Sequence, residues 1–138
     1  MSEDSTTPEP VELARRFFAA VNRRDVDAVE SFYAPDAVLR SAEIGTLAGP
    51  AAIRSFFEDI LSRYDEFHGE LEEIIDLGNG GGFLVTVSKG RPFGGDEEVR
   101  LRVATVLVGT ESVIEQQTNY LDIEEARAVA ERLAESRG

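Results

Sequence analysis

The 138-residue chain contains no cysteine and only one histidine, His68. Without cysteine, disulfides, thiolate nucleophiles and cysteine-ligated metals are excluded. A lone histidine with no cysteine or second histidine beside it also argues against a zinc-type site. We therefore expect no metal and no cofactor, and we expect His68 to have a surface role in preference to a catalytic one.

Basic residues and long apolar runs are also scarce. The chain has 14 lysines and arginines against 27 aspartates and glutamates, a net charge of −13. Such a chain repels phosphate backbones, so we expect no nucleic-acid partner. No apolar run approaches the roughly 20 residues that span a bilayer, and residues 1–7 are polar and acidic, unlike a signal peptide. These features predict a cytoplasmic protein that does not bind membranes.

The length and composition are those of an ordinary globular domain. The hydrophobic share is 42% and the charged share 30%. A chain of this length buries about 68% of the surface that its unfolded form exposes. We expect residues 1–7 to form a disordered tail and residues 8–135 to form a single domain.

The first half of the chain has the periodicity of helices. A first helix is predicted from Pro8 to about Asn22, and Asp25 is placed to cap a second, short one that Pro35 stops. A short strand is expected at 37–41. A third helix begins at Gly49-Pro50, and its apolar stripe recurs at helical spacing, with Ile53, Phe56, Phe57, Ile60, Leu61 and Tyr64 on one face.

After Phe67 the period changes to that of strands. Strands are predicted at 71–77, 83–89, 99–108 and 113–120, separated by three glycine-containing hairpin connections. Asp122 and Glu125 form a capping box that opens a final helix. The expected fold class is α+β: a cone-shaped, curled antiparallel sheet packed with three N-terminal helices, plus a C-terminal helix. Such a cone predicts an apolar pocket.

Two sequence segments, together with this order of elements, resemble a known superfamily. Residues 32–37 read Phe-Tyr-Ala-Pro-Asp-Ala, and residues 49–54 read Gly-Pro-Ala-Ala-Ile-Arg. Over about residues 11–126 the chain resembles the nuclear transport factor 2-like superfamily, in particular its SnoaL-like polyketide cyclase and ketosteroid isomerase branches. The resemblance implies the cone fold but not one reaction, because this fold hosts many unrelated functions.

The resemblance also shows which catalytic groups are absent. The ketosteroid isomerase base falls on Ser41, its oxyanion-hole tyrosine on Phe17, its supporting tyrosine on Phe57 and its protonated aspartate on Ala104. None of these residues transfers a proton at neutral pH, so steroid isomerisation by the family mechanism is rejected.

Two other relatives give no catalytic set either. Limonene epoxide hydrolases use an acid on a strand that corresponds here to residues 82–89, which contain none, and a second acid that falls on Asn119. SnoaL-like cyclases rely on a single acid near the pocket, and no residue of this chain is assigned to it.

The strand predicted at 99–108 decides which residues line the cone. If Ala104 faces the interior, as the resemblance implies, the even-numbered residues line the pocket and an apolar set lies outside: Val99, Leu101, Val103 and Leu107. Such an outer face predicts a homodimer. A four-residue loop at 109–112 would place Arg102 opposite Asn119 and Ala104 opposite Gln117. The register of the preceding strand stays open, with either Thr86 and Ser88 or Val85 and Val87 facing the pocket.

The candidate ligand-binding residues combine these arguments with the resemblance. They are Phe17, Val21, Leu39, Ser41, Ile53, Phe57, Arg102, Ala104, Val106, Gln117 and Asn119, with Arg102, Gln117 and Asn119 as the polar contacts. For Arg102 the alternative is a side chain that extends into solvent at the rim. The favoured function is binding of a small hydrophobic ligand, polyketide-, steroid- or terpenoid-like. The alternatives are an enzyme of the cyclase, isomerase or hydrolase type with a different catalytic set, and a structural or partner-binding dimeric module.

Overall fold

A computed structural model of the protein describes residues 9–41, 44–78, 80–110 and 113–137, so the expected tail at 1–7 lies outside the described residues. In these ranges the elements are α1 (Glu9–Asn22), α2 (Val26–Ser31), β1 (Tyr33–Ser41), β2 (Gly45–Ala48), α3 (Pro50–Ser62), β3 (Tyr64–Gly78), β4 (Gly81–Pro92), β5 (Val99–Thr110), β6 (Val113–Tyr120) and α4 (Ile123–Arg137). None of the helices in those ranges is long and apolar enough to cross a membrane.

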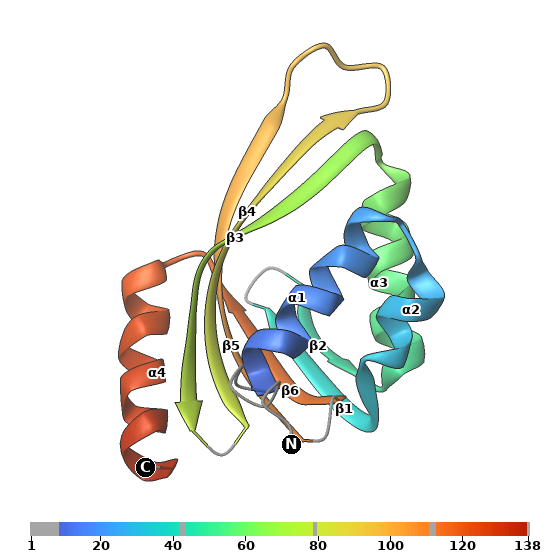
Figure 1. Ribbon diagram of the computed structural model, residues 1–138. Helices are drawn as coiled ribbons and strands as arrows, with labels where there is room; N and C mark the ends of the chain where they lie inside the picture. Colours follow the sequence, from blue (N-terminus) through green and yellow to red (C-terminus); the bar gives the residue numbers. More distant parts are fainter. Residues whose placement is uncertain (1–8, 42–43, 79, 111–112, 138) are drawn as a thin grey trace.

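The six strands form one curled sheet in the order β2-β1-β6-β5-β4-β3. Helices α1, α2 and α3 lie on its concave side, and α4 lies against the opposite, convex side (Figure 1). This arrangement confirms the α+β cone that the sequence predicts. One detail differs: β1 runs parallel to β6, so the sheet is mixed, whereas the other neighbouring strands are antiparallel.

Strand β3 is longer than the sequence predicts, because it starts at Tyr64 and not at Leu71. Its first half lies at the edge of the sheet and carries exposed charged side chains at Asp65, Glu66 and Glu70. An irregularity in the pairing with β4 between Leu71 and Glu73 also interrupts the alternation. Period-two hydrophobicity, the signal used to find strands, is therefore missing there.

Helix α1 is fastened to β3 at a single glycine. Asn22 Nδ2 donates to the carbonyl of Gly69 at 3.0 Å, and the Gly69 N–H donates back to Asn22 Oδ1 at 2.8 Å. A Cβ at Gly69 would lie 3.2 Å from the ring of Phe18, so a larger residue would require this ring to shift. At the end of the helix, Arg24 donates to the carbonyl of Leu61 at 3.0 Å, which joins α1 to α3.

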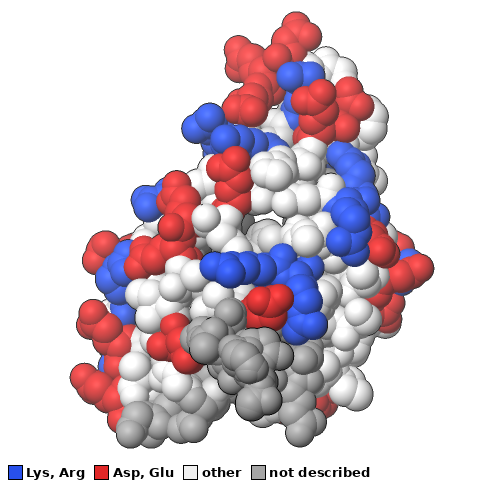
Figure 2. Space-filling view, viewed as in Figure 1, with Lys and Arg blue, Asp and Glu red and all other residues white. Residues whose placement is uncertain are grey.

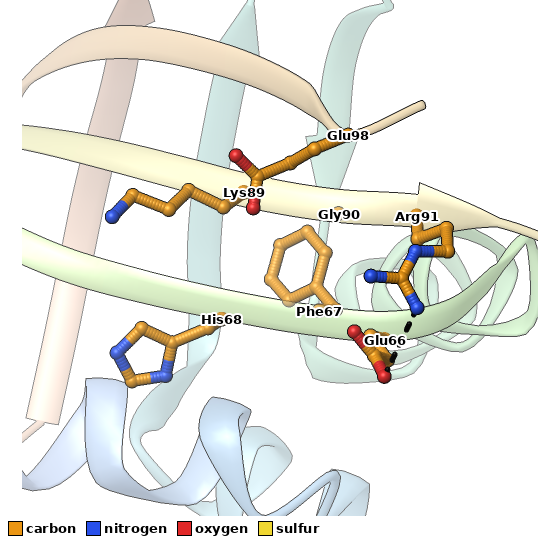
Figure 3. Close-up of a pocket in the computed structure, with 7 residues that line it drawn as sticks. All are labelled: Glu66, Phe67, His68, Lys89, Gly90, Arg91 and Glu98. Carbon is orange, nitrogen blue, oxygen red and sulfur yellow. Dashed lines mark ion pairs between the residues drawn. The ribbon is translucent and has the colours of Figure 1, made fainter. Parts of the chain in front are cut away.

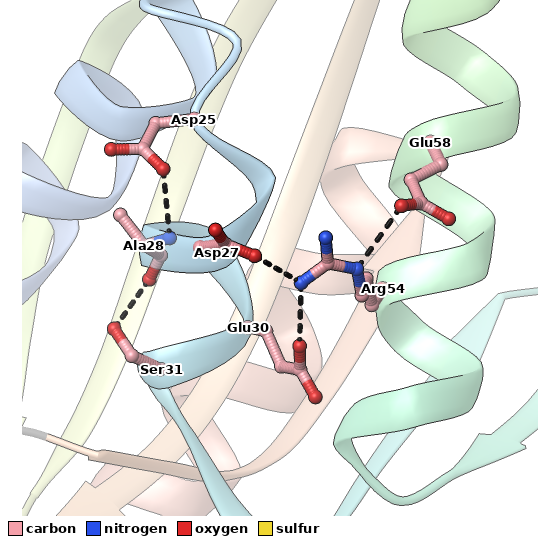
Figure 4. A network of polar contacts seen from close by, with 7 residues as sticks. All are labelled: Asp25, Asp27, Ala28, Glu30, Ser31, Arg54 and Glu58. Carbon is pink, nitrogen blue, oxygen red and sulfur yellow. Dashed lines mark hydrogen bonds and ion pairs between the residues drawn. The ribbon is translucent and has the colours of Figure 1, made fainter.

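Helices α2 and α3 are joined by one arginine (Figure 4). Arg54 contacts Glu30 at 2.9 Å, Asp27 at 2.5 Å and Glu58 at 3.0 Å. Hydrogen bonds to these three carboxylates raise the pKa of the guanidinium. Asp25 caps α2 as the sequence predicts, by accepting from a backbone N–H three residues on. These contacts fix the helical cover of the concave face.

The predicted register between β5 and β6 is wrong. Thr110 pairs with Val113, so only two residues connect the strands, and a bulge follows between Val108 and Gly109. Thr105 therefore pairs with Asn119, Leu107 with Gln117 and Ala104 with Tyr120. A two-residue connection with a bulge replaces the four-residue loop, and the resulting odd-numbered shift exchanges the two faces of β5.

The exchange of faces changes what each side of β5 contacts. Ala104 and Val106 pack with Phe83 and Val85 beneath α4, and not inside the cone. On the other face Leu107 is 3% exposed and packs with Ala14 and Leu84 against α1. The set Val99, Leu101, Val103 and Leu107 is therefore not an outer sheet face, because it belongs to the concave side.

The pairing of β4 with β5 answers the question left open for β4. Leu84 pairs with Thr105, and Thr86 pairs with Val103, so Thr86 shares the concave face with Leu84. Val85 pairs with Ala104 on the face that α4 covers. Thr86 is 5% exposed, and its hydroxyl lies 3.4 Å from the Val103 carbonyl.

Candidate functional site

The concave interior contains a cluster of aromatic rings centred on Phe17 of α1. The Phe17 ring meets Phe18, Phe32, Phe57 and Tyr33 edge to face, with centroid distances of 5.3, 5.8, 5.7 and 5.9 Å. Such edge-to-face pairs fix ring orientations beyond what burial alone does. Five predicted site residues meet in this cluster: Phe17, Val21, Leu39 and Ile53 are buried, and Phe57 is partly buried against them.

A row of neutral polar side chains borders these rings. The Tyr33 hydroxyl donates to Gln117 Oε1 at 2.6 Å, and Gln117 Nε2 donates to Asn119 Oδ1 at 3.2 Å. The Thr105 hydroxyl donates to the same Asn119 oxygen at 2.8 Å. Gln117 is 8% exposed and Thr105 6%, so this row is largely shielded from water.

The parallel pairing of β1 with β6 places Leu39 and one further predicted residue, Ser41, next to the polar row. Leu39 is the register partner of Gln117, and Ser41 is the partner of Asn119. Register partners share a face of the sheet, so Ser41 stands beside Asn119 and the apolar Leu39 stands beside Gln117. Strands β1, β5 and β6 thus supply a polar row next to the rings of α1 and α3.

The chemistry of this interior is hydrogen bonding. Burial raises the pKa of the Tyr33 hydroxyl, so Tyr33 stays a neutral donor at physiological pH. Besides Tyr33, the buried polar and charged side chains among the described residues are Thr86, Thr105 and Gln117, none of which is ionisable. In this part of the chain the interior can orient a ligand, but it offers no group that takes up a proton at neutral pH.

Three predicted site residues lie elsewhere. Arg102 is on the convex face with a side chain that is 58% exposed, and its Nε donates to Glu72 at 2.8 Å. The Arg102 side chain therefore extends into solvent, which is the alternative prediction for it. Ala104 and Val106 are buried beneath α4. The exchanged register of β5 accounts for all three.

Tyr33 and Thr105 belong to the polar row but were not among the predicted residues. Tyr33 was expected at the end of the second helix, just before Pro35, whereas it opens β1. Thr105 lies on the same face of β5 as Leu107, and the predicted register places that face outside the cone. Thr105 comes to lie beside Asn119 only because the two-residue connection is combined with the bulge between Val108 and Gly109.

A hollow lies at the far end of β3 and β4, with a volume of about 150 Å³ (Figure 3). It is lined by Glu66, Phe67, His68, Lys89, Gly90, Arg91 and Glu98. Its charges are paired across the strands, with Arg91 3.3 Å from Glu66 and Lys89 3.5 Å from Glu70. Charges of both signs also alternate over the face of the molecule seen in Figure 2. None of the predicted ligand-binding residues lies in this hollow.

The curled sheet with three helices in its concavity is the nuclear transport factor 2-like fold. The family model of the SnoaL-like domain matches residues 14–110, and the chain belongs to this family. No curated protein matches the sequence at a significant level.

Solved structures with the same fold share few residues with this chain. A protein with a ketosteroid isomerase-like fold from Catenulispora acidiphila, in complex with trimethylamine, is 20% identical with a TM-score of 0.73, and the match covers 83% of this chain and 86% of that chain. A candidate polyketide cyclase from Xanthomonas campestris is 21% identical, with a TM-score of 0.68 and coverages of 88% and 96%. An epoxide hydrolase of the limonene epoxide hydrolase-like type from M. tuberculosis is 16% identical, with a TM-score of 0.70 and coverages of 90% and 90%. At these identities the similarity concerns the fold.

Proposed function

We propose that this protein binds a small, largely apolar molecule of the polyketide, steroid or terpenoid type between α1, α3 and the concave face of the sheet. The observation that carries the proposal is the hydrogen-bonded row from Tyr33 to Asn119, which lies against the aromatic cluster around Phe17. Apolar surroundings with a few converging polar groups are typical of small-molecule sites. The ligand of the C. acidiphila protein, trimethylamine, is also a small molecule.

The proposed contacts are a revised set. They keep Phe17, Val21, Leu39, Ser41, Ile53, Phe57, Gln117 and Asn119 and add Tyr33 and Thr105. Arg102, Ala104 and Val106 are left out, because they lie on the other face of β5. The site is therefore neutral, and an uncharged ligand suits it best.

A polyketide cyclase or hydrolase is the second candidate, favoured by the enzyme types named for two structures with this fold. The neutral side chains of the described interior favour binding over turnover, because general acid–base catalysis needs a group that titrates near the working pH. Incubating the protein with a compound that it binds, and analysing the product by chromatography and mass spectrometry, distinguishes the binding protein from the enzyme. A changed mass or isomer would establish the enzyme.

Ligand-dependent thermal stability tests the binding proposal. The probes are menthone, 5α-androstan-3-one and anthrone, one for each ligand type. A ligand at 100 times its Kd stabilises the folded state by about 2.7 kcal/mol, which raises the melting temperature measurably. We expect at least one probe to do so for the wild type and for Phe93→Trp, whose site is 62% exposed, but not for Phe57→Trp, which fills the interior. No shift with any probe, or equal shifts in the two variants, would contradict the proposal.

We also propose a cytoplasmic homodimer, with a different argument from the sequence-based one. Val99 and Leu101 are both 46% exposed, near the end of β5 that extends beyond the helices. Covering such side chains favours association. Light scattering should give a dimer at micromolar concentration for the wild type and a monomer for Leu101→Asp. A monomeric wild type would contradict the dimer.

A further inference from the structure

The hydrogen bonds of the polar row all run in one direction, from donor to acceptor, and the first donor is Tyr33. A neutral phenol has one proton to donate, and Tyr33 donates it to Gln117 Oε1 at 2.6 Å. With its oxygen turned to Tyr33, Gln117 presents its Nε2 group to Asn119. An amide nitrogen only donates, so the atom of Asn119 that it meets at 3.2 Å must be the oxygen.

Thr105 reinforces this orientation from the neighbouring strand. Its hydroxyl donates to the same Asn119 Oδ1 at 2.8 Å. The oxygen thus receives two hydrogen bonds, which equals its two lone pairs. Both donors hold the Asn119 amide the same way round.

The remaining group of this amide is the Asn119 NH2, with two protons. Among the described residues none accepts a hydrogen bond from it, although Asn119 is only partly exposed. A shielded donor without a protein acceptor gains most from an acceptor on a ligand. The row therefore ends in a donor whose orientation is set by side chains that lie farther inside.

We infer that this protein selects ligands through an acceptor oxygen, such as a ketone carbonyl, that accepts from Asn119 Nδ2, and that Tyr33 and Gln117 are positioning residues that keep this donor turned to the ligand. The inference rests on the proposed binding function and narrows it to oxygenated members of the ligand class. A hydrocarbon of the same shape fills the apolar part of the site but leaves the Asn119 NH2 without a partner.

Matched probe pairs test this selection by calorimetry. Each pair exchanges one carbonyl for CH2: menthone with p-menthane, 5α-androstan-3-one with 5α-androstane, and anthrone with 9,10-dihydroanthracene. For a pair that binds, we expect the wild type to prefer the ketone by about tenfold, the contribution of one shielded hydrogen bond. Asn119→Leu, which keeps the size of the side chain, should abolish this preference, because it weakens binding of the ketone and leaves binding of the hydrocarbon unchanged.

The control is Gln116→Leu. Gln116 is exposed and precedes Gln117 on the opposite face of β6, so the substitution should leave both affinities unchanged. Equal affinity of the wild type for ketone and hydrocarbon would overturn the inference while the binding function stands. If neither member of any pair binds, the binding function itself fails, and the inference with it.

The positioning role of Tyr33 has its own measurement. Tyr33→Phe leaves the ring in the cluster and removes only the hydroxyl that orients Gln117. We expect the ketone-to-hydrocarbon affinity ratio to fall severalfold, because Gln117 is then free to turn over and only Thr105 still orients the Asn119 amide. A role limited to packing would weaken both ligands equally and leave the ratio unchanged, which would overturn this part of the inference.

Discussion

The two faces of the sheet are closed by different means. On the concave face, large aromatic rings from α1, α3 and the segment that follows α2 meet a row of neutral polar groups that ends at Asn119. On the convex face, α4 lies close to the sheet through the small residues Ala126 and Ala130, which pack on Phe83 and Ala104. Small side chains let a helix approach closely and leave no room for a ligand, so the convex contact is structural.

The polar contacts of the two faces differ in the same way. Arg127 of α4 forms two hydrogen bonds with Glu73 of β3, at 2.8 and 3.1 Å, and its guanidinium lies 5.0 Å from the centre of the Phe83 ring. This ion pair is at the margin of the contact, where both side chains are 34% exposed. Charged side chains attach α4 at the solvent-exposed margin of its contact with the sheet, whereas the polar side chains in the interior of the cone are neutral. Under the proposed function the ligand binds at the concave face, whereas the convex face holds α4.

The largest expected effect comes from a charge beneath α4. Ala104→Asp places a carboxylate without a partner at a site that is 0% exposed, which should lower the free energy of unfolding by about 3–5 kcal/mol. Arg102→Ala, two residues along the same face but exposed, should change it by less than about 1 kcal/mol. Urea unfolding measures both. Equal stabilities would mean that Ala104 lies open to a cavity, as the sequence-based register required.

The sequence predicts the fold better than the faces of its strands. Helical and strand periods, the capping residue Asp25 and the glycine-rich connections are local signals, and they identify the helices and most strands. The register of β5 against β6 depends on a bulge of one residue after Val108, which has no signature in the residues themselves. Because side chains alternate between the two faces of a strand, this one extra residue places every side chain of β5 before the bulge on the face opposite to the predicted one.

The candidate site was predictable to the extent that it consists of helix and last-strand residues. Phe17, Val21, Ile53 and Phe57 follow from the apolar stripes of two helices, and they come together as expected. The hydrogen bond from Tyr33 to Gln117 joins residues 84 positions apart. No local pattern contains such a contact, because it depends on the parallel pairing of β1 with β6.

The second effect tests the shielding of the concave face. Tyr33→Phe leaves Gln117 Oε1 without its donor, which should cost about 1–2 kcal/mol of stability.

Burial raises the pKa of Tyr33, so the unfolded chain ionises first as the pH rises. Wild-type stability should therefore fall above about pH 10 by up to 1.4 kcal/mol per pH unit from this residue. The variant lacks that slope. Urea unfolding between pH 8 and about pH 11 measures the difference, and parallel pH curves would show that Tyr33 is open to water.

The smallest effect tests the attachment of α4. Arg127→Met keeps an apolar side chain over Phe83 but removes both hydrogen bonds to Glu73, which should cost about 1 kcal/mol because the pair is partly exposed.

Arg127 holds the pKa of Glu73 below its usual value. The contribution of this carboxylate is therefore present above its ordinary pKa, about 4.3, and is lost as the pH falls through the lowered value. The difference between wild type and variant should shrink at acid pH, whereas Arg132→Met, at an exposed position of the same helix, should show no such difference. A gap that stays constant from pH 7 to about pH 3 would mean that packing of Ala126 and Ala130, without the ion pair, holds α4 in place.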